Sequence, residues 1–256
     1  MIDLHCHILP GLDDGSGSVE ESLKMSNIAI KEGITAIVAT PHYAHPSFRK
    51  NEAPIVREAV QRLNEELKSR NLPLKIYEGH ELRIHGDLVS ELEQKEALTM
   101  AGLDTYAFIE FPSNHVPRYA TSLFYQMLTG GYQPVIVHPE RNSELIQNPE
   151  LLYDFVKSGI YTQITASSLT GHNGKNIKKF TAQLVESNLT HIIASDAHNT
   201  HNRPFRLREA YEQVEKEFGQ DYVEMFQQNA ERILDNKAII SDEPQPIRRK
   251  KILGIF

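Results

Sequence analysis

The chain has a single cysteine, Cys6, among its 256 residues, so it cannot form an internal disulfide bond. No window approaches the ~18 consecutive apolar residues that a membrane-spanning helix needs. The chain begins with a short apolar segment and lacks the basic and long apolar regions of a signal peptide. Because disulfide bonds are typical of oxidising compartments, these absences predict a cytoplasmic protein.

The chain also lacks an excess of positive charge. Lys and Arg number 27 against 34 Asp and Glu, which gives a net charge of −7 and a pI of about 5.9. An acidic protein has little general affinity for nucleic acid, so we expect no nucleic-acid partner. A chain of this length, 40% hydrophobic, suits one sizeable core. We assign 1–240 to one domain and 241–256 to a C-terminal tail.

Short apolar segments alternate with helical patterns along the whole domain. The predicted strands are 2–7, 34–39, 74–77, 106–109, 134–137, 161–165 and 190–194. Ser18 stands three residues before Glu21, which is the spacing of a capping box and predicts the start of the first helix. This helix is predicted to end at Gly33. Strands that alternate with helices are joined by parallel crossover connections, so the fold class is α/β.

Six of the seven predicted strands end in His, Glu or Asp. In a closed parallel barrel every strand directs its carboxyl-end residues to one rim, whereas an open sheet concentrates them at one switch point. We therefore predict a distorted seven-stranded β/α barrel. His5 and His7 should face this rim together because side chains alternate along a strand, and Cys6 should face away from it.

The residues at the predicted rim offer only nitrogen and oxygen ligands. They are His5, His7, Asp14, His42, Glu81, Glu110, His138, Asp196 and His198. Any one of them could be a helix cap or a surface residue, but their shared place at strand ends favours a metal site. Such a set suits manganese, iron or zinc rather than calcium and exceeds the needs of one ion, so it predicts two or three ions.

Several motifs resemble those of the PHP (polymerase and histidinol phosphatase) family over nearly the whole chain. They are IDLHCH, TPH at 40–42, GHE at 79–81, IEF, HPER and SDAH. HCHILPGLDDG, IEFP, HPERN and IASDAHN resemble most closely the manganese-dependent tyrosine-protein phosphatases encoded with capsule and exopolysaccharide genes of Gram-positive bacteria. This resemblance implies a distorted β/α barrel, Mn²⁺ as cofactor, and a bacterial tyrosine kinase with a phosphotyrosine-rich tail as partner.

The resemblance also implies three groups of metal ligands. His5, His7, Glu81 and Asp196 would hold one ion, Glu81 would bridge to a second ion held by Glu110 and His138, and Asp14, His42 and His198 would hold the third. Asp13 remains an alternative to Asp14. Arg141 and Arg203 resemble arginines that contact the phosphoryl group; the alternative for each is a salt bridge on the rim.

Three other functions remain open at this point. The same chemistry could act on a small phosphate monoester such as histidinol phosphate or on a nucleic-acid phosphodiester, which the acidic charge disfavours. A metal-stabilised binding protein without turnover is the third, although the complete ligand set argues against it. The basic and apolar residues at 247–256 suggest either a frayed end or peripheral contact with an anionic membrane or a membrane-bound kinase.

Overall fold

The computed structural model describes residues 1–48 and 50–247. All pairs of neighbouring strands in these residues are parallel. One sheet has the order β1-β2-β4, with β1 at Ile2–Cys6, β2 at Ala36–Ala39 and β4 at Lys75–Glu78. The other has the order β3-β5-β6-β7-β8-β9, with β3 at His42–Tyr43, β5 at Glu81–Arg83, β6 at Tyr106–Glu110, β7 at Gln133–Val137, β8 at Tyr161–Thr165 and β9 at Ile192–Ala194. The predicted α/β class with parallel strands is confirmed.

Two of the predicted strands continue past their expected ends after a short break. Thr40 and Pro41 separate β2 from β3, and proline has no N–H for the sheet ladder. Gly79 and His80 likewise separate β4 from β5. The two strands remain neighbours across both breaks, since Ala39 pairs with Glu78 before them and His42 pairs with Glu81 after them.

The predicted closed barrel is not confirmed, because the hydrogen-bonded ladders form two separate sheets. The carboxyl end of β1 does approach the segment that follows β9. The His7 N–H donates to the Ala197 carbonyl at 2.8 Å, and the Asp196 N–H donates to the His5 carbonyl at 2.8 Å. A single parallel bridge joins Cys6 to Ala197.

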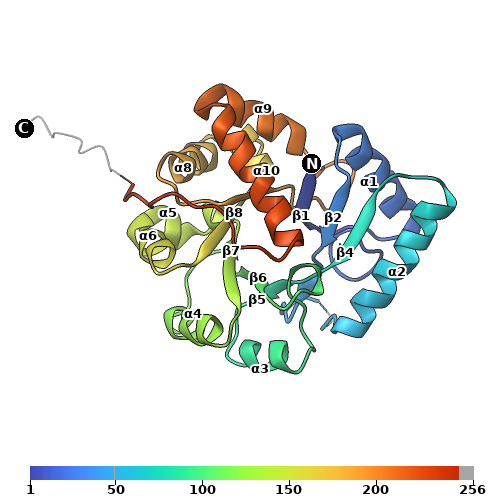
Figure 1. Ribbon diagram of the computed structural model, residues 1–256, viewed down its shortest axis with the longest axis horizontal. Helices are drawn as coiled ribbons and strands as arrows, with labels where there is room; N and C mark the ends of the chain where they lie inside the picture. The colour runs from blue at the N-terminus through green and yellow to red at the C-terminus, as the bar shows by residue number, and fades with distance from the viewer. Residues whose placement is uncertain (49, 248–256) are drawn as a thin grey trace, which may run out of the picture.

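The helices are arranged around the strands, and α10 lies across them in the view of Figure 1. They are α1 (Val19–Glu32), α2 (Ala53–Ser69), α3 (Leu88–Glu93), α4 (Ala120–Thr129), α5 (Ser143–Gln147), α6 (Pro149–Lys157), α7 (Ala166–Thr170), α8 (Lys175–Glu186), α9 (Leu207–Phe218) and α10 (Gln220–Leu234), with single 3₁₀ turns at Met100–Gly102 and Pro139–Arg141. The predicted cap of α1 is confirmed: the Ser18 side chain accepts from the Glu21 N–H, and Gly33 has a left-handed φ of 85°.

Two apolar clusters hold the strands and helices together. The larger one joins the strands to the surrounding helices, and the smaller one gathers Leu4, Phe108 and Val135 from three strands with Ile233 of α10. Strands buried on both faces are typical of parallel sheets. None of the helices in the described parts of the chain is long and apolar enough to cross a membrane.

The predicted C-terminal tail lies mostly outside the described residues, since the description ends at residue 247. Its first part returns to the domain surface. The Gln245 N–H donates to the Ser187 carbonyl at 2.8 Å, and Ile247 packs, partly buried, against the larger apolar cluster.

Candidate metal centre

The structure brings all nine predicted ligands to one site at the carboxyl ends of the strands. Three overlapping groups have their ligand atoms within 4.8 Å of one another: His7, Asp14, His42 and His198; His5, His7 and Glu81; and His42, Glu81 and Glu110. His138 Nε2 lies 2.6 Å from Glu81 Oε1, and Asp196 Oδ1 lies 3.5 Å from Nε2 of both His5 and His7. The side chains that the strand-end pattern selected therefore lie together in the structure.

Glu81 occupies the middle of this cluster. Its Oε2 lies 3.0 Å from His42 Nδ1, 3.3 Å from His7 Nε2 and 3.5 Å from His5 Nε2. Burial alone would raise the pKa of this carboxyl, but the imidazoles of His42 and His5 and the hydrogen bond with His138 hold its pKa well below its usual value. Glu81 is thus ionised and placed to reach more than one ion.

Four buried atoms of the cluster have no hydrogen-bond partner among the described residues. They are His42 Nδ1, Glu110 Oε2, Asp196 Oδ1 and His198 Nε2. Buried polar atoms are nearly always hydrogen-bonded, so this group of exceptions needs an explanation. All four belong to predicted ligands, and nitrogen and oxygen atoms of this kind suit manganese, iron or zinc. The donor set therefore fits bound metal ions.

The neighbouring carboxylates Asp13 and Asp14 have different surroundings. Asp14 Oδ1 lies 3.4 Å from His42 Nε2 and 3.3 Å from His198 Nε2, inside the cluster. Asp13 Oδ2 lies behind His7, 2.7 Å from its Nδ1, and also accepts from the His42 N–H at 3.0 Å. Asp14 is therefore the better-placed ligand, whereas Asp13 orients His7 so that its Nε2 faces the cluster.

The backbone around the cluster is tightly constrained at three positions. A Cβ atom on Gly15 would lie 2.1 Å from the His7 carbonyl oxygen, so only glycine allows the loop to pass this close to β1. His138 and Asp196 have left-handed φ values of 35° and 53°, which non-glycine residues rarely adopt. Backbone strain of this kind is common at functional sites.

Gln163 is a supporting residue that the motif analysis missed. It is fully buried in β8, and its Oε1 lies 2.9 Å from His5 Nδ1. Its Nε2 donates to the Ile164 carbonyl at 2.7 Å, which directs the oxygen toward His5. His5 must then carry its proton on Nδ1 and present the Nε2 lone pair to the cluster. A polar residue within a buried strand was the available signal.

Asp3 and Arg83 are two further supports that the motifs did not reveal. Asp3 is fully buried and accepts from the Ser195 N–H at 2.9 Å and from Ser195 Oγ, bracing the loop that carries Asp196. Burial raises the pKa of Asp3 to about 6. Arg83 pairs with Glu110 Oε1 at 3.2 Å, which leaves Oε2 as the unpartnered atom.

Arg141 and Arg203 both contact Asp196 beside the cluster. Their guanidinium groups donate to Asp196 Oδ2 at 2.7 Å and 2.8 Å, so Oδ1 remains the atom that faces His5 and His7. Both arginines, with Glu110 and His138, line a cavity of about 430 Å³. The salt bridge considered as the alternative is thus present, and it lies at the mouth of the candidate metal centre.

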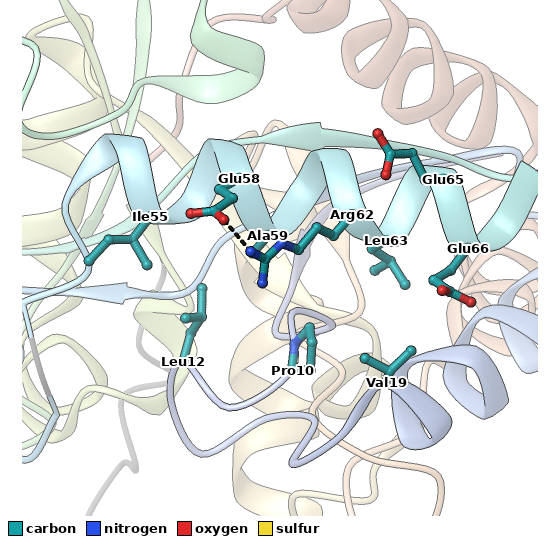
Figure 2. A pocket seen from close by; sticks show the side chains of 10 residues that line it. All are labelled: Pro10, Leu12, Val19, Ile55, Glu58, Ala59, Arg62, Leu63, Glu65 and Glu66. Atoms are coloured by element: carbon teal, nitrogen blue, oxygen red, sulfur yellow. Dashed lines mark hydrogen bonds and ion pairs between the residues drawn. The ribbon is translucent and has the colours of Figure 1, made fainter.

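Figure 2 shows another cavity, of about 380 Å³, between α2 and the loop that precedes α1. Pro10, Leu12 and Ile55 contribute apolar surface, and the charged side chains Glu58 and Arg62 pair with each other. No predicted metal ligand lines this cavity. The chemistry that the motifs indicate therefore belongs to the strand-end cluster.

Residues 1–235 match the family described as "Capsular polysaccharide synthesis, CpsB/CapC". The chain is 47% identical to the tyrosine-protein phosphatase YwqE of Bacillus subtilis over the full length of both, and 38% identical to the putative tyrosine-protein phosphatase CapC of Staphylococcus aureus over the full length of both. It is 32% identical to the tyrosine-protein phosphatase CpsB of Streptococcus agalactiae, over 93% of this chain and all of the relative.

A crystal structure from work on YwqE of Bacillus subtilis and CpsB of Streptococcus pneumoniae, described there as unique metal-dependent tyrosine phosphatases, superposes with a TM-score of 0.94. The alignment has 47% identity and covers 97% of this chain and 100% of that one. Together with the match over 1–235, this agreement confirms the resemblance that the motifs indicated. The chain belongs to the CpsB/CapC family of capsular polysaccharide synthesis proteins.

Proposed function

We propose that this protein is a metal-dependent protein-tyrosine phosphatase. The observation that carries the proposal is the position of Arg141 and Arg203 at the mouth of a buried cluster of nitrogen and oxygen ligands, four of whose atoms lack partners. Relatives that are 47% and 32% identical bear the name tyrosine-protein phosphatase, and a matching structure is described as metal-dependent. The names of these relatives and the geometry of the site thus support the same activity.

The ligands divide among three ions in the way that the resemblance implies, and Glu81 lies within reach of both Glu110 and His138. His5, His7, Glu81 and Asp196 would hold the first; Glu81, Glu110 and His138 would hold the second; and Asp14, His42 and His198 would hold the third. Manganese is the proposed metal, with iron or zinc as alternatives, since all three accept mixed imidazole and carboxylate ligands.

The chemistry that such ions supply when bound is the activation of water and the neutralisation of charge on phosphoryl oxygens. The arginines complete this environment. A guanidinium group has five N–H donors, so Arg141 and Arg203 can hold Asp196 and still donate to the phosphoryl oxygens as charge develops on them. The leaving phenol of phosphotyrosine has a pKa near ~10, and it therefore needs less help from a general acid than an alcohol.

Cys6 does not fit the role of a nucleophile. Its side chain is fully buried, its Sγ donates to the Ala197 carbonyl at 3.4 Å, and burial raises its pKa well above the usual value, so the thiolate is disfavoured. The position six residues beyond it, where cysteine-dependent phosphatases place an arginine, is Leu12. Hydrolysis should therefore proceed without a cysteine intermediate.

The proposed physiological substrate is the phosphotyrosine-rich tail of a bacterial tyrosine kinase that controls polysaccharide export. The rim is open enough for a peptide: the side chains of Asp14 and Arg203 are 43% and 38% exposed. A disordered tail could present its phosphotyrosine there without unfolding a domain. A cytoplasmic location, compatible with the single cysteine, would place the enzyme beside such a tail.

The proposal is tested by kcat/KM for a phosphotyrosine peptide against a phosphoserine peptide, histidinol phosphate and single-stranded DNA, each with manganese. Metal analysis of protein purified without chelator should show manganese, iron or zinc. We expect preference for the phosphotyrosine peptide and loss of turnover after chelation. Preference for histidinol phosphate or DNA would assign the protein to another phosphoesterase activity, and turnover that survives removal of all metal would contradict the mechanism.

A further inference from the structure

Two side-chain rings, those of His45 and Phe48, lie at the edge of the candidate metal centre. The His45 ring centroid is 4.8 Å from that of His42, and the Phe48 centroid is 5.0 Å from it. The two rings are 4.9 Å from each other, and Phe48 lies nearly parallel to His42, with 4° between the planes. We call His45 and Phe48 the aromatic wall.

The aromatic wall is not explained by core packing. Phe48 is only partly buried, and within the described residues both apolar clusters form without it. A phenylalanine outside the core, next to a cluster of histidines and carboxylates, exposes apolar surface where the neighbouring groups are polar. Its position therefore suggests contact with an apolar group that reaches this site.

The loop after β3 holds the aromatic wall in place. The Phe48 N–H donates to the His45 carbonyl at 3.2 Å, and the Ser47 N–H donates to His45 Nδ1 at 3.2 Å. These two hydrogen bonds form a turn that presents both rings on the side of His42. His45 Nδ1 is an acceptor here, so the neutral ring carries its proton on Nε2.

We propose that the aromatic wall packs against the phenyl ring of a bound phosphotyrosine and favours aryl over alkyl phosphate esters. This inference rests on the proposed function and names the residues that select its substrate class. A phosphoryl group bound at the cluster lies close to His42, whose ring nitrogens face Asp14 and Glu81. The phenyl ring, one oxygen away from phosphorus, then leaves the polar centre past the rings that cover His42.

The cavity lined by the two arginines offers a different environment. Arg141, Arg203 and Asn142 line it, and the apolar side chain of Phe111 there is only 5% exposed because it belongs to the larger apolar cluster. This cavity supplies charge and hydrogen bonds for the phosphoryl group. The aromatic wall supplies apolar ring surface for the phenyl group. Two aromatic rings prefer to pack in an offset or tilted arrangement.

The test compares inhibition by phenylphosphonate with inhibition by methylphosphonate in the manganese-loaded protein, using a phosphotyrosine peptide as the substrate. Phe48→Ala should raise the inhibition constant of phenylphosphonate about 3- to 10-fold, the range expected for one aromatic pair, and change that of methylphosphonate less than about 2-fold. Phe48→Leu, which keeps apolar bulk, should show a smaller effect. Metal content should equal that of the parent protein.

Tyr125→Ala is the matched control, because Tyr125 is an aromatic residue of α4 that is 70% exposed. It should leave both inhibition constants unchanged. His45→Ala is a second, independent change in the wall and should shift the same aryl-to-alkyl ratio. An equal rise in the inhibition constants of both phosphonates would mean that Phe48 only packs on His42, and this would overturn the inference. A ratio of the two inhibition constants that stays unchanged in both wall variants would also overturn it. A parent protein without phosphotyrosine turnover would instead contradict the proposed function.

Discussion

Replacing Gln163 with leucine should weaken metal binding although Gln163 is not itself a proposed ligand. Leucine removes the oxygen that lies 2.9 Å from His5 Nδ1 and keeps a side chain of similar bulk in the buried strand. Loss of a hydrogen bond behind a metal-binding histidine typically lowers metal affinity about 10- to 100-fold. The buried Nδ1–H also loses its acceptor, which should lower the free energy of unfolding by about 1–3 kcal/mol.

Both effects can be measured on the same protein. Manganese affinity is obtained by titration against a competing chelator, and the free energy of unfolding of the metal-free protein is obtained from urea denaturation. Gln133→Leu is the control, since Gln133 of β7 donates to the Gly159 carbonyl and contacts none of the cluster. If Gln163→Leu bound manganese as tightly as the control variant does, the assigned role of Gln163 in orienting His5 would be wrong.

Three further predictions address the nucleophile, the arginines and a buried histidine. Cys6→Ser should keep most of the activity while chelators abolish it, and loss of turnover with intact metal content would contradict a mechanism without cysteine. Arg141→Ala and Arg203→Ala should each lower kcat/KM about 100-fold or more on both peptide and small aryl phosphates. His138→Ala should lower turnover and also lose metal in elemental analysis. Normal turnover in both arginine variants would mean that neither arginine contacts the substrate. Burial lowers the pKa of His191 in the folded protein to about 3. As the pH falls, the imidazole of His191 is therefore protonated in the unfolded chain before it is protonated in the folded one. The free energy of unfolding, fully present above about pH 6.5, should fall by about 1.4 kcal/mol per pH unit as the pH drops toward 3. His191→Gln should reduce this slope in urea denaturation between pH 7 and 4, and an equal slope in both proteins would refute the assignment.

The position of the proposed ligands could be predicted because strand ends are readable from sequence. Short β-branched segments locate each strand, and parallel crossovers place all their carboxyl ends on one side. Alternation also directs His80, the neighbour of Glu81, away from the side of the ligands. His80 is fully buried, and its Nδ1 accepts from the Leu98 N–H at 2.9 Å. These features depend only on local pattern and on chain direction.

The supporting residues could not be predicted in the same way. Gln163 contacts His5 across 158 positions of sequence, and Asp3 contacts Ser195 across 192. Such pairs depend on which strands lie opposite each other, and a strand pattern does not specify that. The division into two sheets was missed for a related reason: a motif such as TPH marks a strand end but does not show that pairing resumes at His42.

The two breaks that separate β2 from β3 and β4 from β5 make the metal centre sensitive to chain length. Each break has two residues, and the pairing of His42 with Glu81 follows directly after them. Because side chains alternate along a strand, deletion of one residue such as Gly79 would move Leu82 into the place of Glu81 and turn the carboxylate away. A substitution can remove one ligand, but a one-residue deletion in the second break would exchange a central ligand for an apolar side chain while leaving every other motif intact.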